Sequence, residues 1–481
     1  MPTIQPDPDN PPHQLARTLG VPQIVFMVVA MAAPLTVVAG VVPLMVALGN
    51  GSGVPLNFVL VGAVLLLFTV GFSAITPEIE DAGAFSSYVN KGLGSVAGLG
   101  AAALAVTTYA LLLVAVCAYL GAASRSAISS LTGADVPWWS LTAASIALIA
   151  FLGYRNIEMS ARVLGALLVA EIAVVAALDL GIVLRGGHEG ITASPLGWDA
   201  FTQGAVGTGI MFAIFGFIGF EATAVFRSEA KDPDVTIPRA TYTAVLLIAG
   251  TYALSAWAVV NGAGSGRVVK LAQTDPEGLV PTLADEFVST FAQDAMQVLL
   301  ATSFFACALT AHNVVSRYIF DLGSKGSLPR RLGRAHPRHR SPHVASLVTT
   351  AAVSAAVVIT IATGLDPVLE VYAWFGGAGT LGLIALLALT SLAIAIHFLR
   401  HSGRVSVWRG IAAPGLASVS LVGIAALVID NFPLLIGSNG LAVTFGGVLV
   451  LSFLAGATWG LVRRVRTPAA TSARDDGAGA S

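Results

Sequence analysis

Charged side chains are scarce in this chain. Of its 481 residues, only 11% are Asp, Glu, Lys or Arg, whereas 56% are hydrophobic. Soluble domains carry about 25% charged residues, and the mean hydropathy of +0.82 is correspondingly high. The composition therefore argues against a soluble globular protein and predicts an all-α polytopic membrane protein that sits in a lipid bilayer.

Cysteines and the usual catalytic spacings are scarce or missing as well. Cys117 and Cys307 both lie in apolar runs, so no disulfide framework is indicated. The sequence contains no HExxH-like spacing, no GxSxG motif, no cysteine–histidine set and no Walker loop. These absences argue against a membrane-embedded enzyme and an ATP-driven pump, and we expect no cofactor, no metal site and no nucleic-acid partner.

The first residues lack the pattern of a signal peptide. Residues 1–20 contain five prolines and have no apolar h-region. We predict that they form a disordered cytosolic tail, and that residues 465–481 form a second one. Residues 21–464 between them are the predicted transmembrane domain.

Long apolar runs fill that domain. A spanning helix needs about 20 apolar residues, and we predict twelve transmembrane helices on this basis. Two of the segments, 137–153 and 411–429, are short, so either could be a tilted or partly buried piece. The polar stretch 76–94 predicts a short amphipathic helix instead. The twelve segments are 22–48, 54–75, 95–123, 137–153, 157–184, 203–226, 239–261, 295–322, 343–364, 368–398, 411–429 and 438–462.

The basic residues set the predicted orientation. If residue 1 lies in the cytosol, all but four of the 25 Lys and Arg residues fall on that side, in agreement with the positive-inside rule. The exceptions are Arg125, Arg185, Arg267 and Lys270. Both termini are then cytoplasmic, and we expect the protein in the plasma membrane.

Glycine interrupts the sixth predicted helix, 203–226. Gly216 and Gly219 lie inside its apolar run, just before Glu221, and each helical glycine costs about 1 kcal/mol relative to alanine. Non-helical backbone at membrane depth is tolerated only where protein covers it or where it lines a water-filled cavity. A break beside a carboxylate suggests a site for a polar solute; the alternative is a glycine-rich packing face.

Proline interrupts the first predicted helix, 22–48. Pro34 and Pro43 bracket Thr36 and Gly40, and proline removes hydrogen bonds from the helical ladder. The ladder should therefore open between Ala33 and Gly40.

The two interrupted helices lie five helices apart. Matched breaks of this kind indicate an inverted repeat with a solute site near the midplane. We predict that helices 1–5 (about 22–184) and helices 6–10 (about 203–398) are two such repeats. Helices 11 and 12 (about 411–462) are then peripheral.

Four stretches resemble the amino acid/polyamine/organocation permeases. FGFIGFEATAVFRSEAKDPDVTIPRAT (215–241) is similar to the helix-6 signature of that family, and PEIEDAGAFSSYVNKGLG (77–94) to its loop after helix 2. RNIEMSARV (155–163) resembles the opening of helix 5, and residues 302–345 resemble helix 8 and its exit loop. The resemblance runs from about residue 22 to 400. It implies the five-plus-five inverted-repeat fold of the leucine-transporter type, in which solutes bind between helices 1, 3, 6, 8 and 10.

Helix 1 departs from that family. Amino-acid-handling members usually carry a Gly-Ser-Gly-like run whose bare amides hold the substrate carboxylate, but bulkier residues stand here when counted back from Pro43. We expect the proline-induced break still to expose amides, and an amine or polyamine substrate remains open. The substrate-binding residues expected in helix 1 are Ala33, Pro34, Thr36, Val37 and Val38.

Helix 6 supplies the second half of the expected substrate site. A break there would leave amides and carbonyls unpaired, and the N-terminus of a half-helix attracts a carboxylate. Phe215 falls where relatives place an aromatic gate over the substrate; the alternative is ordinary packing. The expected residues are Phe215, Gly216, Phe217 and Gly219.

Helices 3 and 8 complete the expected site. Tyr109 has a ring and a polar tip that suit an amphiphilic solute, although packing is an equal alternative. His312 could hydrogen-bond the substrate, whereas a lone histidine on an apolar face is more often structural.

Two carboxyl groups in the spans are candidates for ion coupling. Glu171 lies near the middle of the fifth helix, where a charge costs about 3 kcal/mol. In the proton-coupled permeases that the chain resembles, a lysine stands at the matching place, so we expect Glu171 to carry the coupling proton. The alternative is a structural hydrogen bond to helix 1 or 8. Glu221 should pin the broken helices and take some part in coupling.

Two hydroxyl groups of helix 8 suggest sodium as an alternative coupling ion. Thr302 and Ser303 resemble hydroxyls that bind sodium in sodium-coupled relatives. With a carboxylate, they are a plausible set of oxygen ligands for a hard cation. The alternative is a pair of hydrogen bonds to carbonyls of their own helix.

These features together predict a secondary active transporter and not an enzyme. It imports an amino acid or a related small amine by alternating access, coupled to protons. The remaining alternatives are a polyamine or amine permease, an exchanger and a sodium-coupled symporter. A channel would leave the matched breaks unexplained.

Overall fold

The computed structural model describes residues 18–79, 85–155, 161–339, 341–401, 403 and 405–466. Apart from one bridge between Leu19 and Ala230, every regular element in these ranges is helical. Of the predicted tails, 1–20 and 465–481, all but residues 18–20 and 465–466 lie outside the described residues.

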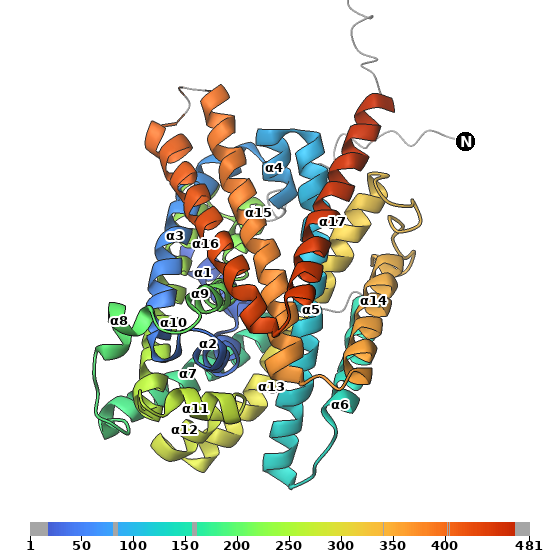
Figure 1. Ribbon diagram of the computed structural model, residues 1–481. Helices are drawn as coiled ribbons and strands as arrows, with labels where there is room; N and C mark the ends of the chain where they lie inside the picture. Colours follow the sequence, from blue (N-terminus) through green and yellow to red (C-terminus); the bar gives the residue numbers. More distant parts are fainter. Residues whose placement is uncertain are drawn as a thin grey trace, which may run out of the picture.

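The α-helices share one bundle, with α4 at one end and α11 and α12 at the other (Figure 1). Their bounds are α1 Val21–Ala32, α2 Val42–Leu48, α3 Val54–Ile75, α4 Phe85–Leu93, α5 Ser95–Thr132, α6 Trp138–Arg155, α7 Ala161–Arg185, α8 Trp198–Phe201, α9 Val206–Gly216, α10 Pro233–Ala263, α11 Val268–Thr274, α12 Leu279–Phe287, α13 Thr290–Ser324, α14 His343–Ala362, α15 Ala373–Arg400, α16 Ala413–Ile436 and α17 Asn439–Arg466.

Within the described residues, eleven helical segments are long and apolar enough to cross a membrane. Each corresponds to a predicted span, and the short prediction 411–429 is part of the longer segment Trp408–Ile436. The other short prediction, 137–153, forms α6, an 18-residue helix that packs on α5, α13 and α14 but is not one of the eleven. The protein is therefore a multi-pass membrane protein, and a span at α6, the fourth of the twelve predicted, stays a prediction.

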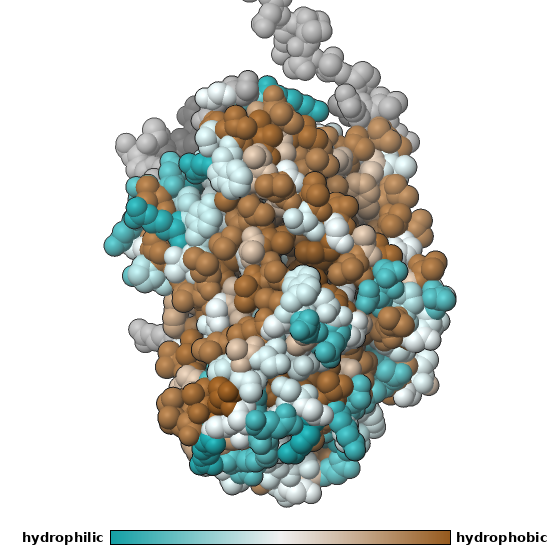
Figure 2. Space-filling view, turned by 60° about the vertical axis from the view of Figure 1, so that its left-hand side comes forward, coloured by the Kyte–Doolittle hydropathy of each residue, from teal (hydrophilic) through white to brown (hydrophobic). Residues whose placement is uncertain are grey.

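The outer surface of the bundle is apolar. Figure 2 shows hydrophobic side chains covering much of one face, with hydrophilic residues gathered toward the ends. Val419 of α16 and Val443 of α17 are 72% and 74% exposed, which would be costly in water but is neutral against lipid tails. This surface is suited to a bilayer.

The first span is broken, as predicted. α1 ends at Ala32, and Ala33 adopts φ 46°, a left-handed conformation that alanine rarely takes. Residues Thr36–Val41 continue as a wide π-helical turn, and α2 follows. The break is thus sharp at Ala33, and the backbone up to Gly40 is rewound instead of open.

The sixth span is broken as well. α9 ends at Gly216, and the chain turns at Gly219 with φ 105°, which glycine alone adopts without strain. Phe220–Glu229 continues as a 3₁₀ helix. Both predicted interruptions are therefore present, whereas the pairing of helices into two inverted repeats stays a prediction.

The amphipathic helix expected in 76–94 is α4, although residues 80–84 lie outside the described part. Phe85, Tyr88 and Val89 are buried against α5 and α15. A Cβ on Gly92 would lie 2.0 Å from the carbonyl oxygen of Ala393, so this helix reaches α15 only because residue 92 is glycine.

Several short elements of the fold were not predicted. α11 and α12, which we call the lid, lie between α10 and α13 in the chain. α11 packs on α2, and α12 packs on α13 and α7. A π-helical turn, Pro367–Tyr372, directly precedes α15 in the same span. Short helices between spans carry no signal in a search for long apolar runs.

Candidate functional site

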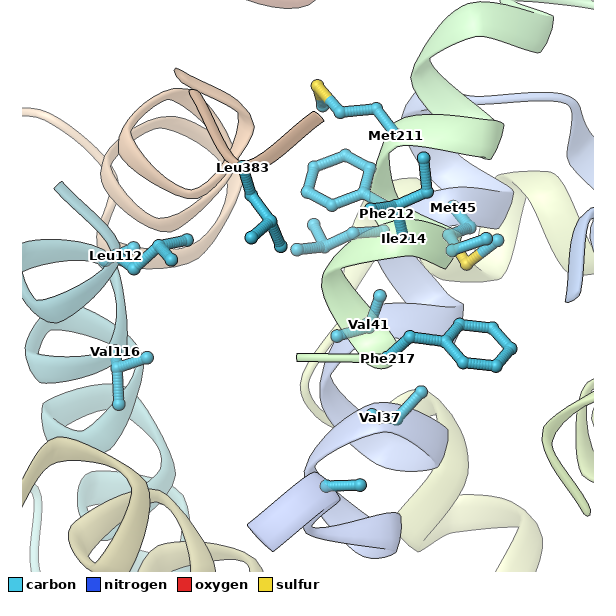
Figure 3. Close-up of a cluster of buried hydrophobic side chains, with 14 of the residues drawn as sticks. Val37, Val41, Met45, Leu112, Val116, Met211, Phe212, Ile214, Phe217 and Leu383 are labelled. Atoms are coloured by element: carbon cyan, nitrogen blue, oxygen red, sulfur yellow. The ribbon is translucent and has the colours of Figure 1, made fainter. Parts of the chain in front are cut away.

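The two helix breaks contact each other in the middle of the bundle. A Cβ on Gly216 would lie 3.1 Å from Cγ1 of Val37, and one on Gly219 would lie 3.3 Å from Cβ of Met31. Glycine at these two positions is what allows the sixth span to approach the first. Figure 3 shows Val37 and Val41 beside Phe217 and Ile214 at this contact.

Most amides at the breaks are already hydrogen-bonded, which differs from the expectation of bare amides. The N–H of Val37 donates to the Ala33 carbonyl at 3.3 Å, and those of Phe217 and Ile218 donate within turns at 3.0 and 3.2 Å. The reason is that both breaks fold into tight or wide turns rather than into extended chain. The amide of Leu35, which was not predicted, donates instead to a side chain.

That side chain is Glu171. Its Oε2 accepts from the Leu35 N–H at 3.4 Å, and the residue is 5% exposed. Ser303 lies beside the same carboxyl group and accepts a hydrogen bond from Thr36 at 2.9 Å. Glu171 of α7 and Ser303 of α13 therefore both bond to residues of the first break, Leu35 and Thr36. Three of the predicted residues, Thr36, Glu171 and Ser303, come together here.

Glu221 holds the second break in a similar way. Its Oε2 accepts from the Gly219 N–H at 3.0 Å, and its Oε1 accepts from the Tyr109 hydroxyl at 3.2 Å. The Tyr109 ring lies over Tyr318, with centroids 6.1 Å apart. Glu221 thus ties the turn at Gly219 to α5, consistent with the pinning role expected for it.

An aromatic cluster lies on one side of the breaks. Phe215 contacts Tyr372 with ring centroids 5.5 Å apart, and Tyr372 contacts Tyr119 at 4.8 Å. Tyr119 stacks on Phe304 at 4.2 Å and donates to the Ala39 carbonyl at 3.2 Å. Phe215 is partly exposed, which suits a gate. Phe304 was not predicted, because a phenylalanine in an apolar helix gives no signal by itself.

Three predicted residues lie elsewhere. Thr302 donates to the Leu299 carbonyl of its own helix at 2.9 Å. His312 lies between α13, α14 and α6, where Nε2 is 3.0 Å from the Thr350 hydroxyl. Phe217 is 1% exposed and points away from α5, toward Tyr252 (Figure 3). Sequence position specifies the helix but not the direction in which a side chain points.

The lid carries a carboxyl group with an altered affinity for protons. Glu277 lies between α11 and α12, and its Oε2 is buried with no hydrogen-bond partner in the described ranges. Burial raises the pKa of Glu277 from its ordinary 4.5 to about 7; the carboxylates of Asp275 and Asp366 raise it further, and Arg125 opposes them. Between these two pH values the folded protein binds a proton that the unfolded chain releases, so folding stability falls as the pH rises.

We expect Glu277→Gln to remove this pH dependence. At about pH 8 the variant should have the higher Tm, because it does not bury a charge, and the difference should shrink toward about pH 5. Scanning fluorimetry of the detergent-purified protein at both pH values checks this. Asp199→Asn, at an exposed carboxylate, is the matched control. A Tm difference for Glu277→Gln that does not change with pH would contradict the assignment.

Comparison with known proteins identifies the family. A family model described as amino acid permease matches residues 19–446. The chain belongs to this family. The permease is therefore a transporter and not an enzyme.

Two named transporters are similar to this chain over more than half of its length. The permease is 25% identical over 354 residues to an uncharacterized transporter of Mycobacterium tuberculosis (strain H37Rv), covering 73% of this chain and 75% of the relative. It is 26% identical over 301 residues to the aromatic amino acid transport protein AroP of Escherichia coli K12, covering 60% of this chain and 63% of AroP.

Proposed function

We propose that the permease imports an amino acid or a related small amine by alternating access, driven by a proton gradient. The observation that carries the proposal is the hydrogen bond between Glu171 and the amide of Leu35 at the first break. It joins a group that can bind a proton to the backbone segment expected to bind the solute.

The hydrogen bond supplies a physical link between proton and solute. Ionised Glu171 is a better acceptor for the Leu35 N–H than the protonated acid is, because charge-assisted hydrogen bonds are about twice as strong as neutral ones. Protonation weakens this acceptor and frees the first break to change shape. A proton and a solute that favour the same arrangement of residues 33–36 help each other to bind, so they are coupled through that segment.

The aromatic cluster beside the breaks favours a solute with a neutral side chain. Phe215, Tyr372, Tyr119 and Phe304 present rings from four different spans. Aromatic rings stack on other apolar or aromatic groups. AroP is named as an aromatic amino acid transporter, so aromatic and other neutral amino acids are the first substrates to test here.

Alternating access is supported by the contact between the breaks. Because Val37 packs directly on Gly216, a solute can enter between them only if the two spans separate. In the proposed cycle the first two and the sixth and seventh spans rock against the others, which is the motion expected of two inverted five-helix repeats. We propose that the α4 end of the bundle faces the cytosol, with both termini, in the plasma membrane.

Sodium coupling is the second candidate, and one observation favours it. The hydroxyls of Thr36 and Ser303 lie 2.9 Å apart, and the Ser303 hydroxyl lies beside the Glu171 carboxyl group. Carboxylate, hydroxyl and carbonyl oxygens are the ligands that a hard cation takes.

The proposed function is tested with purified permease in liposomes. We expect uptake of a tritiated mixture of proteinogenic amino acids to exceed equilibrium when the interior is alkaline, and to do so equally in sodium and potassium buffers. A thermal-shift panel of single amino acids and polyamines then identifies the substrate, because ligands that bind the folded state raise its Tm. Accumulation that requires sodium would favour the second candidate, and an absence of accumulation would contradict secondary active import.

A further inference from the structure

A second carboxyl group lies inside the span that carries Glu171. Asp179 follows Glu171 by eight residues on α7, and its Oδ2 accepts a hydrogen bond from Ser255 of α10 at 2.6 Å. Its Oδ1 is buried, and neither an ion pair nor another hydrogen bond to Asp179 occurs in the part of the chain that the structure describes. Ionisable groups at membrane depth are rare and usually functional. The sequence analysis did not single out Asp179.

Polar groups continue from Asp179 toward Glu171 along α10. Tyr252 precedes Ser255 by three residues, which places both on one face of the helix. The Tyr252 hydroxyl donates to the Ala32 carbonyl at 3.0 Å, directly before the first break, and the residue lies within electrostatic range of Glu171. Asp179 therefore bonds α10 directly through Ser255, and Tyr252, on the same face of α10, lies within electrostatic range of Glu171.

A cavity with polar groups in its wall lies beyond Asp179, toward the lid end of the bundle. This cavity, of about 230 Å³, is lined by Glu189, Thr192, Asn261 and Ser265, among others. Asn261 follows Ser255 by six residues, about 9 Å along α10. Two of the charged groups near this cavity have partners: His188 pairs with Glu286 at 2.9 Å, and Arg185 donates to the main-chain carbonyl of Glu286 at 2.5 Å.

We propose that Asp179 is a relay residue through which protons from the lid side reach Glu171. A hydronium ion in the cavity gives its proton to the Asp179 carboxylate and becomes water. The proton then passes to the Glu171 carboxylate along the face of α10 that carries Ser255 and Tyr252. Asp179 is left ionised and Glu171 protonated, so charge and protons balance. This inference rests on the proposed role of Glu171 as the coupling residue.

Asp179→Asn tests the relay, because asparagine keeps an oxygen that can accept from Ser255 but cannot carry the proton. The probe is the tritiated amino acid mixture in liposomes with an alkaline interior. We expect gradient-driven accumulation to fall at least about tenfold, while counterflow, which needs no net proton movement, stays within about threefold of wild type. Asp179→Glu should restore accumulation, and Ser255→Ala, which keeps the carboxyl group, should retain most of it.

The outcomes separate the relay from the proposed function. If Asp179→Asn accumulates like wild type while Glu171→Gln does not, the relay is wrong and the coupling role of Glu171 stands. If Asp179→Asn loses counterflow as severely as accumulation, Asp179 only joins two helices and the relay is again wrong. If Glu171→Gln accumulates normally, the coupling proposal itself fails, and the relay fails with it.

Discussion

Glu171→Gln should abolish accumulation driven by a pH gradient. Glutamine can still accept from the Leu35 N–H, so the break keeps its local partner, but the side chain no longer gains or loses a proton. We expect the accumulation ratio to fall to equilibrium and counterflow to stay within about threefold of wild type, because solute exchange requires only the alternation of the two states. Both are measured in liposomes with the tritiated amino acid mixture.

Ser303→Ala is the matched control for this prediction. It removes the hydroxyl that lies beside Glu171 and accepts from Thr36, but it leaves the carboxyl group in place. In a proton-coupled permease it should retain gradient-driven uptake, whereas in a sodium-coupled one it should weaken the dependence on sodium. Unchanged gradient-driven uptake by Glu171→Gln would eliminate the coupling role of this residue.

Gly219→Ala should disable transport by distorting the second break. Residue 219 has φ 105°, and an added Cβ would lie 3.3 Å from Cβ of Met31. Strained backbone of this kind costs about 1–3 kcal/mol, so the turn should relax toward another shape. The Gly219 amide would then move away from Glu221, to which it donates at 3.0 Å. We expect uptake and counterflow both to fall by about tenfold or more.

Gly250→Ala provides the comparison for that variant. Gly250 lies within α10, and a Cβ there meets open space. Alanine favours a helix by about 1 kcal/mol relative to glycine, so this variant should be at least as stable as wild type and should transport normally. Equal transport by the two variants would show that the conformation at Gly219 does not matter for function.

Local chemistry made much of the architecture predictable. Apolar runs long enough to span a bilayer locate the helices, since lipid leaves few alternatives for the backbone. The second span was predicted as 54–75, and α3 is Val54–Ile75. Proline and glycine act within their own helix, so the interruptions near Ala33 and Gly219 could also be found without any knowledge of neighbouring helices.

The partners of each side chain could not be predicted in this way. Leu35 and Glu171 are 136 residues apart in the chain, and Thr36 and Ser303 are 267 apart. Whether Phe217 faces the solute or Tyr252 depends on how the turn after α9 packs against α3 and α10, which single-sequence patterns do not encode. The same holds for His312, whose surroundings are set by α6 and α14.

The sequence by itself therefore determined that this is a helical membrane protein with its first and sixth predicted spans broken, because those properties depend on composition and on residues adjacent in the chain. Only the tertiary structure decided that the break amides are mostly occupied, that Glu171 binds the amide of Leu35, and that Asp179 faces Ser255. Those contacts join different helices, and the packing of apolar surfaces sets how helices are placed against one another.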